Sequence, residues 1–188
     1  MNTQNALAAA KTLLEQCGRF LAQKASDGKD ISTARLDAFQ GTAYDLAWVA
    51  SEVYAAEQIC AYADKHGELE KALAEYFTAE MVANFSQKVS FHFHEWGVDQ
   101  PKLVETIWKP ELTKDVEKVL AADNVARIAQ LIKKANHGGS YGLDENHQMF
   151  RETFKKFAED KVAPLAEKVH RHDLLIPQEI IDGLKELG

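Results

Sequence analysis

Residues 33–65 read TARLDAFQGTAYDLAWVASEVYAAEQICAYADK, and this stretch decides the fold class. Apolar residues recur along it at alternating steps of three and four, the spacing that puts them on one side of a helix in a bundle. The members of the series are Leu36, Phe39, Ala43, Leu46, Ala50, Val53 and Cys60. Glu57 falls in the same series, so it lies either at the rim of a wide apolar stripe or buried against a cation.

The other segments have the same helical period, and no alternating strand pattern interrupts them. Helices are predicted over 3–25, 33–65, 68–96, 111–121, 123–136, 145–170 and 178–187, with a further one starting near Pro101. The buried side of the third helix is predicted to carry Leu69, Leu73, Phe77, Met81, Phe85, Val89 and His92. The sequence therefore predicts an all-α chain built on a bundle of long antiparallel helices.

A glycine-rich stretch, HGGSYG at 137–142, separates two amphipathic blocks. Three glycines in six residues are typical of a linker. The sequence therefore predicts an N-terminal helical bundle over 1–136, a linker over 137–143 and a second helical region over 144–188. Pro164 lies inside the helix predicted for that second region and removes one amide donor, so we expect a kink or a break there.

The composition is that of an ordinary globular protein, with 46% hydrophobic and 27% charged residues among 188. A net charge of −7 argues against a nucleic-acid or anionic-membrane surface, because both need clustered basic residues. No stretch approaches the ~18 apolar residues of a membrane span. Cys17 and Cys60 are isolated and are predicted to be reduced, buried thiols. The predicted location is cytoplasmic.

Two histidine clusters are candidate sites. His92, His94 and Glu95 suggest a metal, but residues two apart on a helix point about 200° away from each other, so one ion cannot take both histidines. One packed and one solvated histidine is the expectation. The second cluster, His170, Arg171, His172 and Asp173, ends a helix, where cationic side chains interact favourably with the helix dipole. A pH-sensing or ligand role is the alternative.

Neither a phosphate loop nor a nucleophile can be defended from the sequence. Gly138, Gly139 and Gly142 lack the preceding strand of a dinucleotide fingerprint, which favours a hinge. Cys17 lies in an alanine-leucine helix with no histidine at a meaningful offset. We therefore assign no catalytic, cofactor-binding or metal-ligating residue within 1–188.

Residues 143–188 carry a family resemblance in the order and spacing of their motifs. The run FRETFKKFAEDKVAPLAEKV (150–169) is followed by Pro177 and a short helix closing on Leu187 and Gly188. This region resembles the N-terminal helical domain of the acyl-CoA dehydrogenase family, FAD enzymes of fatty-acid metabolism. The resemblance implies a longer enzyme in which a glutamate base and the flavin desaturate an acyl-CoA. No such group can be located in 1–188, so this piece alone is expected to be inactive and free of FAD.

A looser resemblance covers residues 33–97. The stretch 46–85, with AEYFTAE at 74–80, is similar to the C-terminal helical domain of the same family. Family members then carry a glycine-rich loop near the flavin, where this chain has HFHEWG at 92–97, and Glu75 replaces a usual lysine. The resemblance thus implies a bundle that has lost its FAD contact and keeps a structural role.

Two functions follow as hypotheses. The first is the N-terminal portion of an acyl-CoA dehydrogenase-like flavoprotein, truncated at Gly188, in which 144–188 wall one side of the acyl pocket. Its expected partners are an acyl-CoA substrate and further copies of itself in a homo-oligomer, with no nucleic acid and no membrane span. The alternative is a non-enzymatic helical module for interaction or oligomerisation.

Overall fold

The computed structural model describes residues 1–188, which are predominantly helical. The elements are α1 (Thr3–Ala25), α2 (Thr33–Asp37), α3 (Gln40–Ala63), α4 (Glu68–Phe91), α5 (Gln100–Glu105), α6 (Pro110–Leu120), α7 (Ala122–Ala135), α8 (Glu145–Phe157), the π-helical turn η1 (Ala158–Val162), α9 (Ala163–Arg171) and α10 (Gln178–Glu186). One isolated bridge joins Ser26 and Ile31 without forming a strand, so the all-α prediction is confirmed. No helix combines the length and apolar character needed to cross a bilayer.

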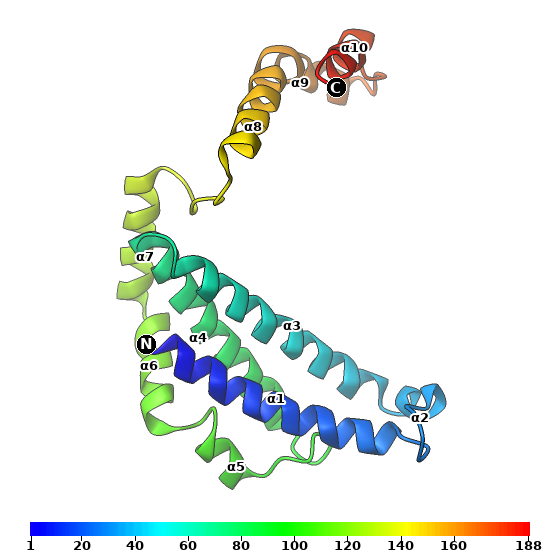
Figure 1. The fold of residues 1–188 in the computed structure, drawn as a ribbon, viewed down its shortest axis with the longest axis vertical. Helices are drawn as coiled ribbons and strands as arrows, with labels where there is room; N and C mark the ends of the chain where they lie inside the picture. Colours follow the sequence, from blue (N-terminus) through cyan, green and yellow to red (C-terminus); the bar gives the residue numbers. More distant parts are fainter. The chain divides into compact units, whose positions relative to one another are not determined.

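The chain divides into two compact units, unit 1 (Met1–Ser140) and unit 2 (Tyr141–Gly188). In unit 1 the long helices α1, α3 and α4 pack against one another, and α3 runs antiparallel to both of the others (Figure 1). The pair α6 and α7 packs on α4 and completes the bundle. The short connection at 64–67 between α3 and α4 favours their antiparallel arrangement.

Every second residue of the apolar seam of α3 lies one position before the residue that the sequence pattern predicts. Its buried residues are Thr42, Leu46, Val49, Val53, Ala56, Cys60 and Ala63. Ala56 therefore occupies the place that the sequence pattern gave to Glu57. The Glu57 carboxylate lies at the rim of the seam, 43% exposed and 2.5 Å from Lys11 Nζ. A pair this exposed stabilises the fold by about 0–1 kcal/mol.

Two predicted helices are not continuous over their predicted ranges. The helix predicted over 33–65 is interrupted at Ala38 and Phe39, because Phe39 leaves the helical region and packs against the core. The helix predicted over 68–96 ends at Phe91, and turns carry the chain to Gly97. Of its predicted buried side, Leu69, Met81, Phe85 and Val89 are buried, while Leu73, Phe77 and His92 are partly exposed.

Trp96 is the largest side chain that unit 1 buries completely. Its ring meets Phe85 edge-on with centroids 6.2 Å apart, and its indole nitrogen donates to the carbonyl of Thr42 over 3.2 Å. The apolar ring is therefore packed, and its one hydrogen-bond donor has an acceptor. Truncating a buried aromatic such as Phe85 to alanine costs about 3–5 kcal/mol.

Unit 2 consists of a helical hairpin, in which α8, η1 and α9 form one continuous helical path followed by α10. Pro164 lies at the start of α9, just after the π-helical turn, and the Ala163 amide donates to Ala158 five residues back. The interruption expected at the proline thus takes the form of one wide turn. Ile180 is the one buried residue of unit 2, so its apolar surface is largely open.

Candidate functional site

The α9–α10 pocket is an apolar hollow of about 570 Å³ in unit 2. Its lining residues are Val162, Leu165, Ala166, Val169, His170, Asp173, Leu174, Ile176, Pro177, Ile180 and Leu184. The Leu174 amide donates to the Val169 carbonyl over 3.0 Å, which turns the chain back after α9. Such a surface suits hydrocarbon or the apolar side chains of another protein element, because burying them removes apolar area from water.

Close packing between the two arms of the hairpin shapes this pocket. A Cβ built at Gly183 of α10 would lie 2.5 Å from Cε2 of Phe157 on α8. Any larger residue at position 183 would therefore have to displace the Phe157 ring. Outside the pocket the apolar surface continues over exposed side chains, with Leu175 92% and Ile176 62% exposed.

The predicted helix-end cluster lies beside the α9–α10 pocket. His170 and Arg171 occupy the last turn of α9, where the carbonyl ends of the helix favour positive charge. Arg171 Nε lies 2.7 Å from Glu167 Oε1, so its guanidinium is already paired. His170 and Asp173 line the pocket, while His172 is exposed.

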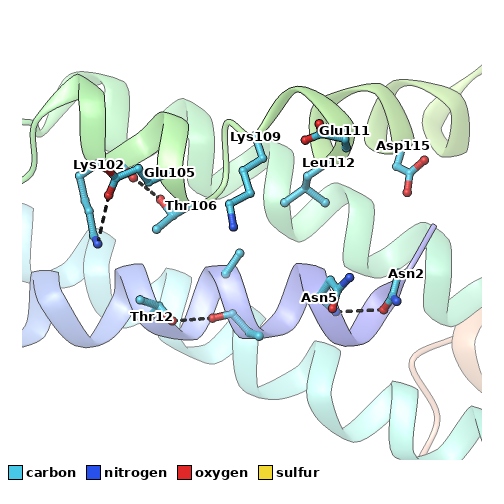
Figure 2. A pocket seen from close by; sticks show the side chains of 12 residues that line it. Asn2, Asn5, Thr12, Lys102, Glu105, Thr106, Lys109, Glu111, Leu112 and Asp115 are labelled. Carbon is cyan, nitrogen blue, oxygen red and sulfur yellow. Dashed lines mark hydrogen bonds and ion pairs between the residues drawn. The ribbon is translucent and has the colours of Figure 1, made fainter.

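A polar groove of about 590 Å³ in unit 1 runs between α1 and the segment α5–α6 (Figure 2). Lys109 reaches into it from the connection between α5 and α6, and no anion pairs with its ammonium. Asn2 caps α1 by accepting from the Asn5 amide over 3.0 Å, and Thr12 donates to Ala8 over 2.8 Å. Most polar groups in the groove thus serve the helices themselves, and no nucleophile faces a base.

The described arrangement does not bring His92 and His94 together. Residues 92–97 form turns, so the argument from helical spacing does not apply there. His92 stacks on Trp96 with ring centroids 4.9 Å apart, whereas His94 is exposed. No group of three or more histidine, cysteine, aspartate or glutamate side chains is placed to hold a metal ion.

His92 belongs instead to a charged cluster between α3 and the end of α4. Its Nε2 lies 3.1 Å from Asp45 Oδ2 and its Nδ1 lies 2.6 Å from Glu95 Oε2. Carboxylates only accept, so both hydrogen bonds form when the imidazole carries both protons. Asp45 also contacts Lys88 Nζ at 2.5 Å.

These contacts favour the charged carboxylates. The hydrogen bond from Lys88, followed by that from His92, holds the pKa of Asp45 below its ordinary value. The hydrogen bond from His92 likewise lowers the pKa of Glu95. Asp45 and Lys88 were not predicted as site residues from the sequence. The sequence signal that could have predicted this pair is the position of two opposite charges, each beside the apolar seam of one of two neighbouring helices.

The two cysteines are buried at separate places in unit 1. Burial raises the pKa of the Cys17 thiol to about 12, so almost no thiolate forms near neutral pH. The Cys60 sulfur lies 3.4 Å from the Thr78 hydroxyl oxygen. Both residues behave as small core side chains.

The predicted glycine linker follows α7, with no strand before it. Gly139 and Gly142 have positive φ angles of 123° and 61°. The Gly139 amide donates to His137 Nδ1 over 3.1 Å, and the Ser140 amide donates to Glu70 Oε1 over 2.8 Å. These amides are directed at protein acceptors. They do not form a phosphate cradle.

Comparison with known proteins gives two matches. Residues 144–188 match the family model described as "Acyl-CoA dehydrogenase, N-terminal domain". The chain is also 29% identical over 198 aligned residues to "(2S)-methylsuccinyl-CoA dehydrogenase" of Cereibacter sphaeroides. The chain is related to the acyl-CoA dehydrogenase family. The second alignment covers 98% of this chain, so it includes unit 1, and 35% of the length of that relative.

The related family uses FAD, and the loop at 92–97 is the part of unit 1 where such a cofactor would be approached. The loop at 92–97 corresponds, by the resemblance, to the family's glycine-rich loop. In this chain aromatic side chains of unit 1 occupy the space beside it. Trp96 is fully buried, and a Cβ at Gly97 would lie 2.3 Å from the Phe20 ring. A backbone that packs against its own aromatic rings cannot approach a phosphate. The residues of the loop at 92–97 do not fit a flavin.

Proposed function

We propose that residues 1–188 are the N-terminal portion of an acyl-CoA dehydrogenase-like flavoprotein, whose FAD-dependent α,β-dehydrogenation of an acyl-CoA is performed by other parts of the protein. The observation that carries this proposal is the open apolar surface of unit 2, within the region that matches the family's N-terminal domain. Phe150 is 57% exposed and Leu175 92% exposed. Fully burying a large apolar side chain contributes about 1.5–3 kcal/mol, so this surface favours a covering partner element.

In this proposal unit 2 has a structural role. The α9–α10 pocket and the exposed face of α8 pack against the remainder of the enzyme and wall one side of the acyl pocket. The mainly apolar lining of the α9–α10 pocket supports lining over proton transfer.

Unit 1 is proposed to be a structural bundle similar to the family's C-terminal helical domain. Support comes from the packed helices α3 and α4 and from the alignment, which extends over both units. The flavin is proposed to lie outside unit 1, because Phe20 and Trp96 fill the corresponding loop. A cytoplasmic location and a homo-oligomeric state are proposed with it.

Expression of the complete gene tests the proposal directly. The purified protein should show the absorbance of bound flavin and should reduce an artificial electron acceptor with an acyl-CoA. The substrates offered should include (2S)-methylsuccinyl-CoA and straight-chain acyl-CoAs. Residues 1–188 alone should be colourless and inactive. A colourless complete protein that turns over no acyl-CoA contradicts the proposal.

A matched pair of variants tests the role of unit 2. Leu175→Asp places a charge on the surface expected to be covered, and Tyr54→Asp does the same on unit 1, where Tyr54 is 64% exposed. In residues 1–188 both variants should keep the parent melting temperature, since neither side chain is buried. In the complete protein only Leu175→Asp should lower the flavin content and activity. Equal behaviour of the two variants contradicts the proposed packing.

A helical interaction module is the second candidate, and one observation favours it. Trp48 and Phe91 are 53% and 79% exposed and line the same groove of unit 1. Exposed aromatic side chains are enriched at protein interfaces. Sedimentation of residues 1–188 and of the Trp48→Ala, Phe91→Ala chain tests self-association through this groove. A monomer in both cases removes the support that this groove gives to the module.

A further inference from the structure

Glu70 is a buried carboxylate that forms no ion pair with a lysine or arginine. It is 6% exposed, and it lies in the first turn of α4. Oε2 accepts from the Gly67 amide over 3.1 Å, and Oε1 accepts from the Ser140 amide over 2.8 Å. A buried carboxylate is costly unless hydrogen bonds satisfy it, and here two backbone donors do so. The amide of Ser140, before that of Gly67, holds the pKa of Glu70 below its ordinary value.

The second of these amides comes from a distant part of the chain. Ser140 follows α7 and lies 70 residues after Glu70. The Tyr62 hydroxyl of α3 donates to the carbonyl of the same Ser140. One residue of the glycine-rich segment is therefore held at both its amide and its carbonyl, by side chains from two helices.

The neighbouring residues fit the same place. A Cβ built at Gly139 would lie 3.8 Å from the Tyr62 hydroxyl oxygen and 3.9 Å from Cδ1 of Leu73, so Gly139 lies beside these two side chains of the bundle. The Tyr62 ring stacks on His66 with centroids 4.0 Å apart, which fixes the position of the hydroxyl. Glycine-rich segments are flexible when nothing holds them. Residues 137–140 are held.

We propose that Glu70 and Tyr62 form a latch that fastens residues 137–140 to unit 1. Opening the latch releases residues 137–140 from unit 1 and so adds them to the connection between the two units. The latch is a local device of unit 1 and does not depend on the function proposed above.

Three variants of the 188-residue chain test the latch. Glu70→Gln keeps the shape of the side chain but leaves one amide N–H facing an NH₂ group. Tyr62→Phe removes the other hydrogen bond to Ser140 without changing α4. Glu68→Gln is the matched control, because Glu68 lies in the same first turn but its side chain is 74% exposed and pairs with Arg127.

Hydrogen exchange of peptides covering 137–143 and 66–72, together with chymotryptic cleavage after Tyr141, gives the readout. Glu70→Gln and Tyr62→Phe should each speed exchange over 137–140 and cleavage by about fivefold or more, as expected for a local opening. Glu68→Gln should leave both rates unchanged. If Glu70→Gln destabilises the whole bundle, the comparison of Tyr62→Phe with Glu68→Gln decides. Unchanged exchange over 137–140 in Tyr62→Phe, or faster exchange confined to 66–72 in Glu70→Gln, overturns the proposal.

Discussion

The ring of Phe20 occupies the space where a side chain at Gly97 would begin. A Cβ at position 97 would lie 2.3 Å from Cδ2 and 2.4 Å from Cγ of Phe20, and Gly97 has a φ of +63°. Gln16 of α1 also donates to the Gly97 carbonyl over 3.1 Å. The chain can therefore leave α4, bury Trp96 and pass close under α1 only with glycine at this position.

Gly97→Ala should destabilise unit 1 by about 2–3 kcal/mol, because it combines a steric clash with an unfavourable φ. Thermal unfolding followed by circular dichroism measures the change. Gly18→Ala is the control, since a Cβ at Gly18 of α1 meets no atom within 4 Å. Alanine in a helix interior should raise stability by about 0.5–1 kcal/mol. Effects of the same sign at both positions contradict this prediction.

Cys17 should resist thiol reagents in the folded protein. Its pKa is raised to about 12 by burial and it is fully shielded from solvent, so neither thiolate nor access is available. In a Cys60→Ala chain at pH 8, titration with Ellman's reagent should detect no thiol in buffer and a single thiol in guanidinium chloride. Rapid modification of the folded chain would contradict the packing of α1.

Asp45 should make stability depend on pH. Its pKa is lowered in the folded state by Lys88 and His92, so its contribution is present above the unfolded value of about 3.9 and is lost as the pH falls through the lower folded value. Asp45→Asn should cost about 1 kcal/mol at pH 7, a fall of about 2–4 °C in melting temperature, and clearly less near pH 3.

Glu117→Gln on α6 serves as the control for Asp45→Asn, because Glu117 is exposed and forms no ion pair. Its melting temperature should follow that of the parent chain at both pH values. A constant difference between Asp45→Asn and the parent from pH 7 to pH 3 would show that the loss is one of packing and not of charge.

Unit 2 should open more readily than unit 1 in the 188-residue chain. Ile180 is its one buried residue, whereas α3 and α4 each bury several. Amide exchange over α8, α9 and α10 should be faster than over α3 and α4 by about a hundredfold or more, because protection follows buried contacts. Equal protection on both sides of Ser140 would indicate a single cooperative core.

The helical class and most helix positions could be predicted from the sequence, since both follow from local periodicity and proline or glycine positions. The seam of α3 shows where such reasoning stops. Two series with the same spacing share Leu46, Val53 and Cys60, and only the contacts with α1 and α4 select Ala56 over Glu57. The series without a charged member was the better choice, because a carboxylate is rarely buried without a partner.

The interruptions and the side-chain clusters required three-dimensional information. Nothing in the local sequence marks the break at Phe39, because its cause is packing against the core. Glu70 is spaced three residues after Gly67, as in a helix cap, and this signal was readable. Its second partner, Ser140, is 70 residues away and no local pattern reveals it.

The wide turn η1 has a geometric consequence for unit 2. In an uninterrupted α-helix, eight residues from Phe157 to Leu165 would rotate the second side chain by about 80° from the first. The extra residue accommodated between Ala158 and Val162 sets the following helix back by about one residue's rotation, so Leu165 and Val169 stay in phase with Phe157. A single continuous apolar stripe along α8 and α9 is therefore available for contact with a partner element that covers this hairpin.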